Sequence, residues 1–404
     1  MEMEALVDWT ELPPELIETI SENLTIYCDY LRFQAVCRCF RSSVPKTPSR
    51  LPPQLPWLML PQSQQSHHSR RAFFDLSANR VRFLHLPEAS DHGKRRCGSS
   101  HGWLVILDET PNVLLLNPLT RAKIYLPPLF TFPNVVSFNY FEIGREYTLS
   151  FWRGSGGGRF NRNLRQMRDS FIKKIVLSSS PGKGSDFIAV AILNQTGDLA
   201  YCRNGDQGWS IIEGTKSYCE DVIYNKGLFY AVDKGGAVAV CDVGAGDSAT
   251  VSIIRTPPQL GGDMQYLVSS GDELLLVTRF LGLEFGFEPD HPQLIYRTIR
   301  FEVFRLNWSG PQWERVRSLG DKVLFIGENS SLSLSASDFP GCGRDSIYYT
   351  DDYSEGNFDD VLGQHDSGIF SLCSGSIEPL PCYPRNLHYR LRWPPPLWVS
   401  PNPC

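Results

Sequence analysis

From about residue 72 onward, short apolar runs alternate with turn signals at close intervals. Each run has the length of a β-strand and is rich in Val, Ile, Tyr or Phe, the residues enriched in strands. The chain's 33 glycines and 29 prolines supply frequent turns and leave little room for long helices. The pattern therefore restricts this region to an all-β fold of many short strands. The expected strands are 81–86, 103–107, 113–116, 187–193, 199–202, 227–232, 237–240, 274–278, 301–306, 346–350 and 368–373.

These runs also recur as groups that resemble one another. Candidate repeats begin near Cys97, Phe187, Cys219, Gln265 and Leu332. Trp209 and Trp313 stand at equivalent late positions in two of the repeats. Several intervals agree with the roughly 40–50 residues of a propeller blade, and others are lengthened by insertions. We therefore expect a propeller-like domain, which leaves few open sheet edges, with a pair of β-sandwiches as the alternative.

Residues 9–45 have a different pattern, in which apolar residues recur at helical spacing. They are Leu12, Leu16, Ile17, Ile20 and Leu24, followed by Leu31, Ala35, Val36 and Phe40. Pro13 and Pro14 suit the first turn of a helix, and Asp29 is the expected cap of a second one. A helical unit this short cannot bury all of these side chains internally. We therefore expect one face to be covered by a partner.

The length of 404 residues exceeds one ordinary core, so two folded units are expected. Between them lies a proline-rich stretch, and proline at this density breaks helices and stiffens the chain. The predicted division is a helical module at 8–48, a linker at 49–71, a propeller-like domain at 72–390 and a proline-rich tail at 391–404.

The charge of the chain is modest, with 39 Lys and Arg against 44 Asp and Glu. This argues against a bulk electrostatic footprint for DNA or RNA. No apolar run approaches the roughly 18 residues of a membrane-spanning helix, and no signal peptide is visible. The 11 cysteines are then expected to be reduced thiols in the cytoplasm or nucleus.

Two short patterns resemble catalytic or ligand-binding motifs but lack the required context. The segment 98–102, Gly-Ser-Ser-His-Gly, matches a nucleophile elbow, which needs a helix after the serine. Here a strand is expected instead. Cys97 and His101 lack the further ligands of a zinc site. We therefore expect no catalytic residue, no metal and no cofactor.

One basic and one acidic segment are expected to be exposed insertions. A glycine-rich stretch at 154–158 is followed by arginines at every third position, Arg159, Arg162, Arg165 and Arg168. A helix would place them roughly along one side. A solvated face is the simplest interpretation. The alternative is that the four arginines bind an acidic partner surface or a phosphate-bearing client, which makes them candidate client-binding residues. The acidic segment 351–360 is expected to be a solvated loop.

The helical unit resembles an F-box. The matching residues are Leu12, Pro13, Leu16, Ile17, Ile20, Leu24, Asp29, Leu31, Arg32, Phe33, Ala35, Val36, Cys37 and Arg41. Phe40 departs from the pattern, because many F-boxes have Trp there, but it keeps an aromatic ring. The remainder resembles the plant family in which an F-box precedes a kelch-like domain. The matching segments are 102–105, 116–121, 126–128 and 341–352, and no good match lies between 140 and 180.

The resemblance implies a non-catalytic substrate-recognition subunit of a SKP–cullin–F-box ubiquitin ligase. The F-box would bind a SKP-type adaptor, and through it a cullin–RING ligase, while the second domain would hold an unknown client protein. The residues carried over for the adaptor contact, or for the fold behind it, are Leu12, Pro13, Leu16, Ile17, Leu31, Val36 and Phe40. The alternatives are an interaction scaffold that acts without ubiquitination and, less favoured, a propeller hydrolase or sugar-binding domain.

Overall fold

The computed structural model of the chain describes residues 9–46, 48, 52–61, 69–89, 93–151, 158–182, 186–194, 196–244, 246, 248–258, 261–288, 291–339, 341–353, 366–382 and 395–403. Within these residues, no helix combines the length and apolar character needed to cross a bilayer.

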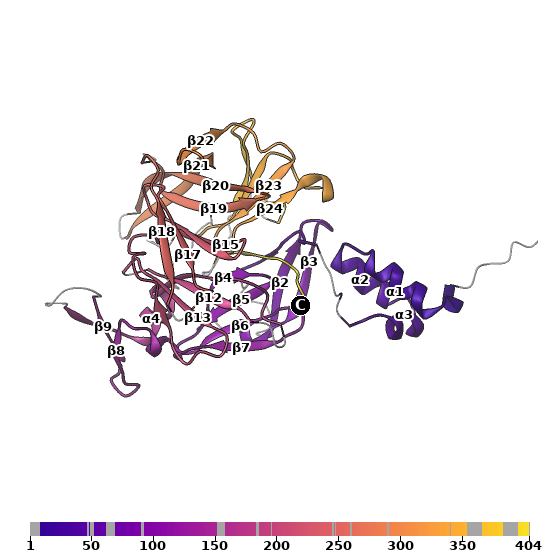
Figure 1. Cartoon of the computed structure of the whole chain (residues 1–404), viewed down its shortest axis with the longest axis horizontal. Helices are drawn as coiled ribbons and strands as arrows, with labels where there is room; N and C mark the ends of the chain where they lie inside the picture. Colours follow the sequence, from indigo (N-terminus) through magenta and orange to yellow (C-terminus); the bar gives the residue numbers. More distant parts are fainter. Residues whose placement is uncertain are drawn as a thin grey trace, which may run out of the picture.

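Three short α-helices form the N-terminal unit, as the spacing of its apolar residues predicts (Figure 1). After the 3-10 turn η1 (Trp9–Glu11) come α1 (Pro14–Glu22), α2 (Tyr27–Gln34) and α3 (Arg38–Ser43). Pro14 begins α1, where its missing N–H has no helical partner to lose. The core of the unit consists of Ile17, Tyr30, Phe40 and Val44.

The expected cap at Asp29 is wrong. Asp29 lies inside the first turn of α2, whose N-cap residue is Ile26. The Asp29 carboxylate instead pairs with Arg32, one turn along the exposed side of the helix, at 2.6 Å. Its charge still lies at the positive end of the helix dipole.

The described residues of the second unit form seven sheets, six of which succeed one another as blades. The first blade contains β28 (Leu397–Val399), β1 (Trp57–Met59), β2 (Arg70–Asp75) and β3 (Arg80–His85). The second contains β4 (Arg95–Ser100), β5 (Trp103–Leu107), β6 (Val113–Leu116) and β7 (Lys123–Leu126). The third contains β11 (Ile172–Leu177), β12 (Ile188–Leu193), β13 (Leu199–Arg203) and β14 (Ser210–Ile211).

The remaining blades continue in sequence order. The fourth contains β15 (Asp221–Asn225), β16 (Leu228–Val232), β17 (Val238–Asp242) and β18 (Thr250–Ile254). The fifth contains β19 (Met264–Ser270), β20 (Glu273–Glu288), β21 (His291–Asn307) and β22 (Gln312–Val316). The sixth contains β24 (Leu332–Ser335), β23 (Lys322–Ile326), β25 (Ser346–Tyr349), β26 (Gly368–Ser371) and β27 (Ile377–Glu378), with β23 and β25 parallel. Short 3-10 turns lie at Pro87–Ala89, Leu129–Thr131 and Ala336–Asp338.

The six blades form a closed ring, which makes this domain a β-propeller (Figure 1). Each pair of neighbouring blades encloses its own buried apolar cluster, from the first and second blades round to the sixth and first. The last cluster joins Trp398 of the first blade to Phe325 of the sixth, with ring centroids 5.1 Å apart. The alternative of paired β-sandwiches is wrong, because each blade packs against two neighbours rather than one.

The two tryptophans at equivalent positions of the repeats have the same role. The Trp209 indole N–H donates to the carbonyl of Pro127 at 2.9 Å, and that of Trp313 donates to the carbonyl of Gly236 at 2.7 Å. Each bond ties the outer part of one blade to the blade before it. The repeat seen in the sequence therefore marks a repeated contact between blades.

The first blade is built from both ends of the domain, which differs from the predicted limits. Strand β1 lies within the predicted linker, 49–71, and β28 lies within the predicted tail, 391–404. The two pair with each other in antiparallel register, Leu58 opposite Trp398. Each of these strands has three residues, which is too short to show the alternation of apolar and polar residues typical of a strand. Prolines lie near both of them.

A further sheet stands outside the ring. It contains β10 (Arg159–Arg162), β9 (Tyr147–Ser150) and β8 (Val135–Phe138), and the short helix α4 (Leu164–Ser170) follows it. Figure 1 shows β8 and β9 projecting from the side of the propeller. This insertion occupies most of the region in which the sequence resembled no family, and we call it the side sheet.

Candidate functional sites

The helical unit leaves a set of apolar side chains uncovered. Leu16, Leu31 and Val36 are 51%, 41% and 60% exposed, whereas Ile17 and Phe40 are buried in the core of the unit. The structure thus divides the residues proposed for adaptor contact into a surface group and a supporting group.

The remaining residues of this set lie at the edge of the helical core. Leu12 packs partly against the core, and Pro13 is exposed at the start of α1. Two further apolar residues of the unit, Trp9 and Ile20, are also exposed. Ile20 lies four residues after Leu16 and so shares its face of α1. That spacing is visible in the sequence, while the exposure of Trp9 has no sequence signal.

A buried glutamine joins the helical unit to the propeller. The Gln54 Oε1 accepts a hydrogen bond from the Tyr27 N–H at 2.9 Å, and its Nε2 donates to the carbonyl of Thr25 at 2.8 Å. Gln54 thus satisfies a free N–H at the start of α2, where Ile26 has no side chain able to do so. Cys28 of the same helix packs against the cluster between the first and second blades. These contacts connect α2 to the first blade.

A cavity of about 390 Å³ lies at one end of the central channel, on the side of the linker. The cavity wall includes one residue from the innermost strand of each blade: Trp398, Ser99, Val176, Ile223, Ser269 and Leu332. Pro52, Pro53 and Pro56 of the linker lie against the same cavity. Its lining consists of neutral hydroxyl, amide and apolar groups and one histidine.

The serines of the elbow-like segment join inner strands together. Ser99 donates to the carbonyl of Trp398, and the Ser100 hydroxyl accepts from the Leu177 N–H at 3.1 Å. The segment turns directly from β4 into β5, so it lacks the helix of a nucleophile elbow. Burial lowers the pKa of the His101 imidazole, and its Nε2 lies 3.2 Å from the carbonyl oxygen of Leu177. This geometry describes an interblade polar network.

The opposite end of the channel is lined by charged groups around a space of about 20 Å³. Lys174 and Asp221 form a buried ion pair at 2.7 Å. Arg95 lies 3.7 Å from Glu328. Among the residues that the structure describes, no group of three or more His, Cys, Asp or Glu side chains is arranged to hold a metal ion.

Burial raises the pKa of Glu328 to about 7 from 4.5, although Arg95 acts in the opposite direction. Because the folded-state pKa is the higher one, the contribution of Glu328 to stability falls as the pH rises from about 4.5 to about 7. We expect Glu328→Gln to remove this loss. The variant should exceed the wild type by about 2 kcal/mol in free energy of unfolding at neutral pH, with the difference closing toward acid pH. Denaturant titrations across this pH range measure it.

The glutamine variant leaves Arg95 with acceptors, because its guanidinium also donates to the carbonyls of Asp169 and Ile172 at 2.6 and 2.9 Å. Glu18→Gln, at an exposed position of α1, is the matched control and should show no pH-dependent gain. A gain for Glu328→Gln that does not vary with pH would refute this account.

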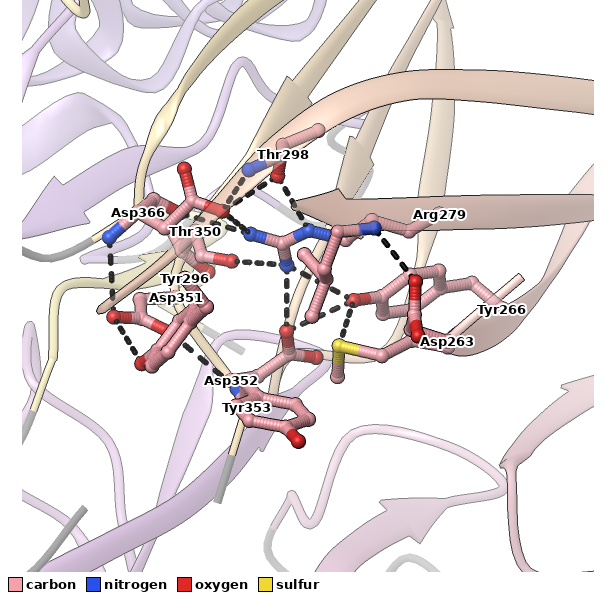
Figure 2. A network of polar contacts seen from close by, with 12 residues as sticks. Asp263, Tyr266, Arg279, Tyr296, Thr298, Thr350, Asp351, Asp352, Tyr353 and Asp366 are labelled. Carbon is pink, nitrogen blue, oxygen red and sulfur yellow. Dashed lines mark hydrogen bonds and ion pairs between the residues drawn. The ribbon is translucent and has the colours of Figure 1, made fainter. Parts of the chain in front are cut away.

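A buried arginine near the charged end organises the acidic segment (Figure 2). Arg279 is fully buried, and its guanidinium bonds Asp352 and Asp366, each at 2.9 Å. It also donates to Thr298 at 2.8 Å and to the carbonyl of Thr350 at 3.1 Å. Figure 2 shows these partners converging on it from strands of the fifth blade and from the flanks of the acidic segment.

The sequence predicted that the acidic segment is a solvated loop, and at the start of the segment this prediction is wrong. Asp351 is 1% exposed and accepts from the Tyr296 hydroxyl at 2.9 Å. Burial raises the pKa of Asp352, and Arg279 opposes the rise. Residues 354–360 of the predicted loop lie outside the described residues.

The four basic residues do not share one side of a helix, and that expectation is wrong. Arg159 and Arg162 lie on β10, whereas Arg165 and Arg168 lie on α4. The change occurs at Asn163, whose side chain caps α4. Arg168 is 2% exposed and held in ion pairs, while Arg159 and Arg165 are exposed. Most of the preceding glycine-rich stretch, 154–157, lies outside the described residues.

Comparison with known proteins covers both units. Residues 73–371 match the family described as KIB1-4 β-propeller. Over 416 aligned residues, the chain is 31% identical to the F-box protein SKIP23 of Arabidopsis thaliana, covering 98% of this chain and 96% of that protein. It is 27% identical to the F-box protein At2g17036 of the same plant, covering 98% and 95% of the two chains.

Proposed function

Because the chain belongs to the plant F-box proteins with a KIB1-4 β-propeller, we propose that it is the non-catalytic substrate-recognition subunit of a SKP–cullin–F-box ubiquitin ligase. In this proposal the module at 8–48 binds a SKP-type adaptor, and the propeller domain holds a client protein. Ubiquitin transfer then follows from the high local concentration of client lysines near the ligase. The complex acts in the cytoplasm or nucleus, and no residue of this chain makes or breaks a bond.

The observation that carries the proposal is the uncovered apolar surface of the helical unit. Leu16 and Ile20 present one face of α1, and Leu31 and Val36 come from α2 and the turn after it. Large apolar side chains exposed together on a small unit are typical of a protein contact site. Apolar helical faces bind by lying against the groove or helices of a partner. The buried residues Ile17 and Phe40 hold these helices in place.

Replacing Leu16 and Val36 together by aspartate is expected to lower the affinity for a SKP-type adaptor on the order of 100-fold or more, because two apolar contacts become buried charges. Both side chains are more than half exposed, so the unit should still fold. Binding is measured with purified adaptor and the full chain. Ile17 is not used, since a charge in the core would unfold the unit.

The matched control is Tyr125→Asp with Trp308→Asp, two exposed aromatic positions of the propeller, at 63% and 50% exposure. This pair should bind the adaptor like the wild type. Undiminished adaptor binding by the Leu16 and Val36 variant would exclude the helical surface as the docking site.

A further inference from the structure

The side sheet is attached to the propeller by one face only. Tyr147 and Leu149 of β9 are buried in the cluster between the second and third blades, and Phe160 of β10 packs against the same cluster. On the other face, Val136 is 44% exposed. The inward face therefore anchors the sheet to the propeller. The outer face, the hairpin tip and the sheet edges can contact a partner.

The hairpin between β8 and β9 presents two large apolar side chains to solvent. Phe141 and Ile143 are 91% and 90% exposed. The hairpin is nonetheless ordered by its own hydrogen bonds. The Asn139 side chain accepts from the Phe141 N–H at 3.1 Å, and the Gly144 N–H donates to the Glu146 carboxylate at 3.0 Å. A loop that is already ordered loses little conformational entropy on binding.

The free edge of the side sheet is basic. Strand β10 pairs with β9 on one side, and the described residues place no strand on its other side. Neither Arg159 nor Arg162 has an ion-pair partner among the described residues, and the Arg162 Nε is buried without a hydrogen-bond partner there. The hairpin has two carboxylates: Glu146 is buried, and Glu142 is exposed but lies 3.8 Å from the Arg145 guanidinium. An acidic partner is the complement of such an edge.

The strand geometry restricts the shape of that partner. Successive side chains of a strand point to opposite faces, so Arg159 lies on the outer face of the sheet. Arg162 lies on the inward face beside Phe160, and its guanidinium carbon is 5.2 Å from the centroid of that ring. A segment that runs along the edge of β10 is the arrangement that reaches both arginines. Arg162 lies opposite Tyr147, the first residue of β9 after the hairpin. The same segment therefore reaches the Phe141 and Ile143 hairpin at its Arg162 end.

We propose that the side sheet is the client-docking surface, and that it binds an extended acidic segment with bulky apolar residues at one end. This inference rests on the proposed substrate-recognition function. The segment adds a strand to β10 through backbone hydrogen bonds, its carboxylates pair with Arg159 and Arg162, and its apolar end packs on Phe141 and Ile143.

The probe is a labelled synthetic peptide with an acidic, strand-forming half followed by a half rich in Leu and Phe. Its binding to the full chain is measured by fluorescence anisotropy. We expect at least about tenfold weaker binding for a peptide with Lys in place of Glu, and a similar loss for the apolar end replaced by Ser. Equal binding of the acidic and the lysine peptide, or no binding of the acidic peptide, would overturn the proposal.

Two double variants locate the site on the chain. Arg159→Glu with Arg162→Glu, and Phe141→Ser with Ile143→Ser, should each weaken binding of the acidic peptide about tenfold or more. The matched control Arg80→Glu with Arg344→Glu makes the same charge change at exposed positions elsewhere and should bind normally. Unchanged binding by either test variant overturns the assignment to the side sheet.

Adaptor binding measured on the same samples separates the two proposals. The side-sheet variants should bind a SKP-type adaptor like the wild type. Failure of peptide binding with intact adaptor binding rejects the docking surface alone. If the wild-type chain does not bind the adaptor, the proposed ligase function is rejected. The side-sheet variants then still decide whether the acidic peptide binds at the side sheet.

Discussion

Replacing Arg279 by methionine is expected to lower the free energy of unfolding by about 3–5 kcal/mol, the usual cost of removing one partner from a buried ion network. The guanidinium is fully buried and contacts Asp352 and Asp366. Methionine fills much of the volume but leaves both carboxylates buried without their cation. Because the two aspartates lie on either side of residues 354–365, the effect should concentrate where the fifth and sixth blades meet. Urea unfolding followed by tryptophan fluorescence measures it.

Arg305→Met is the matched control in the same blade. Arg305 also forms two ion pairs, with Glu273 at 2.9 Å and Glu314 at 3.4 Å, but all three side chains are exposed. Exposed pairs contribute little, because water solvates each partner when the other is removed. The control should therefore lose far less stability than Arg279→Met. Equal losses in the two variants would refute the view that burial gives the Arg279 network its importance.

Replacing Trp398 by alanine is expected to cost about 3–5 kcal/mol of unfolding free energy, since it leaves a large cavity at the junction where the ring closes. The ring of Trp398 is 1% exposed and packs edge-on against Phe325. Its indole N–H has no hydrogen-bond partner among the described residues, so the loss comes from packing alone. Thermal and urea denaturation of the full chain measure the change.

Trp308→Ala makes the same chemical change on the surface of the fifth blade, where Trp308 is 50% exposed. It should change the unfolding free energy by about 0.5 kcal/mol or less. A Trp398 variant as stable as the Trp308 variant would mean that β28 does not close the ring in solution.

The helical unit was largely predictable because its signals are local. The spacing of Leu16, Ile17 and Ile20 indicates a helix, and Pro13 and Pro14 mark where it starts. The spacing does not say that Leu16 is exposed while Ile17, its neighbour, is buried. That distinction depends on how α1 lies against the rest of the unit. The cap of α2 was mispredicted because the group that serves it, Gln54, comes from beyond the helices.

The repeated units of the propeller were predictable from the sequence, but the position at which each blade begins was predictable only in part. Expected repeat starts near Cys97, Cys219 and Gln265 lie on innermost strands or within two residues of one. The expected start near Leu332 also lies on an innermost strand, β24, although β23 precedes it in the chain. The expected start near Phe187 is one strand late, because it adjoins β12 and misses β11. The regular arginine spacing suggested one helix, but Asn163 starts α4 midway and divides the set.

The sequence by itself determined the order of the two units, the helical and strand-forming character of each, and the kind of apolar surface available for a partner, because these depend on spacing within a few turns or one strand. Only the tertiary structure decided the number of blades, the union of β1 with β28, the burial of Arg168 and the meeting of Arg279 with Asp366. Those outcomes depend on which distant segments lie side by side, and no local period records that.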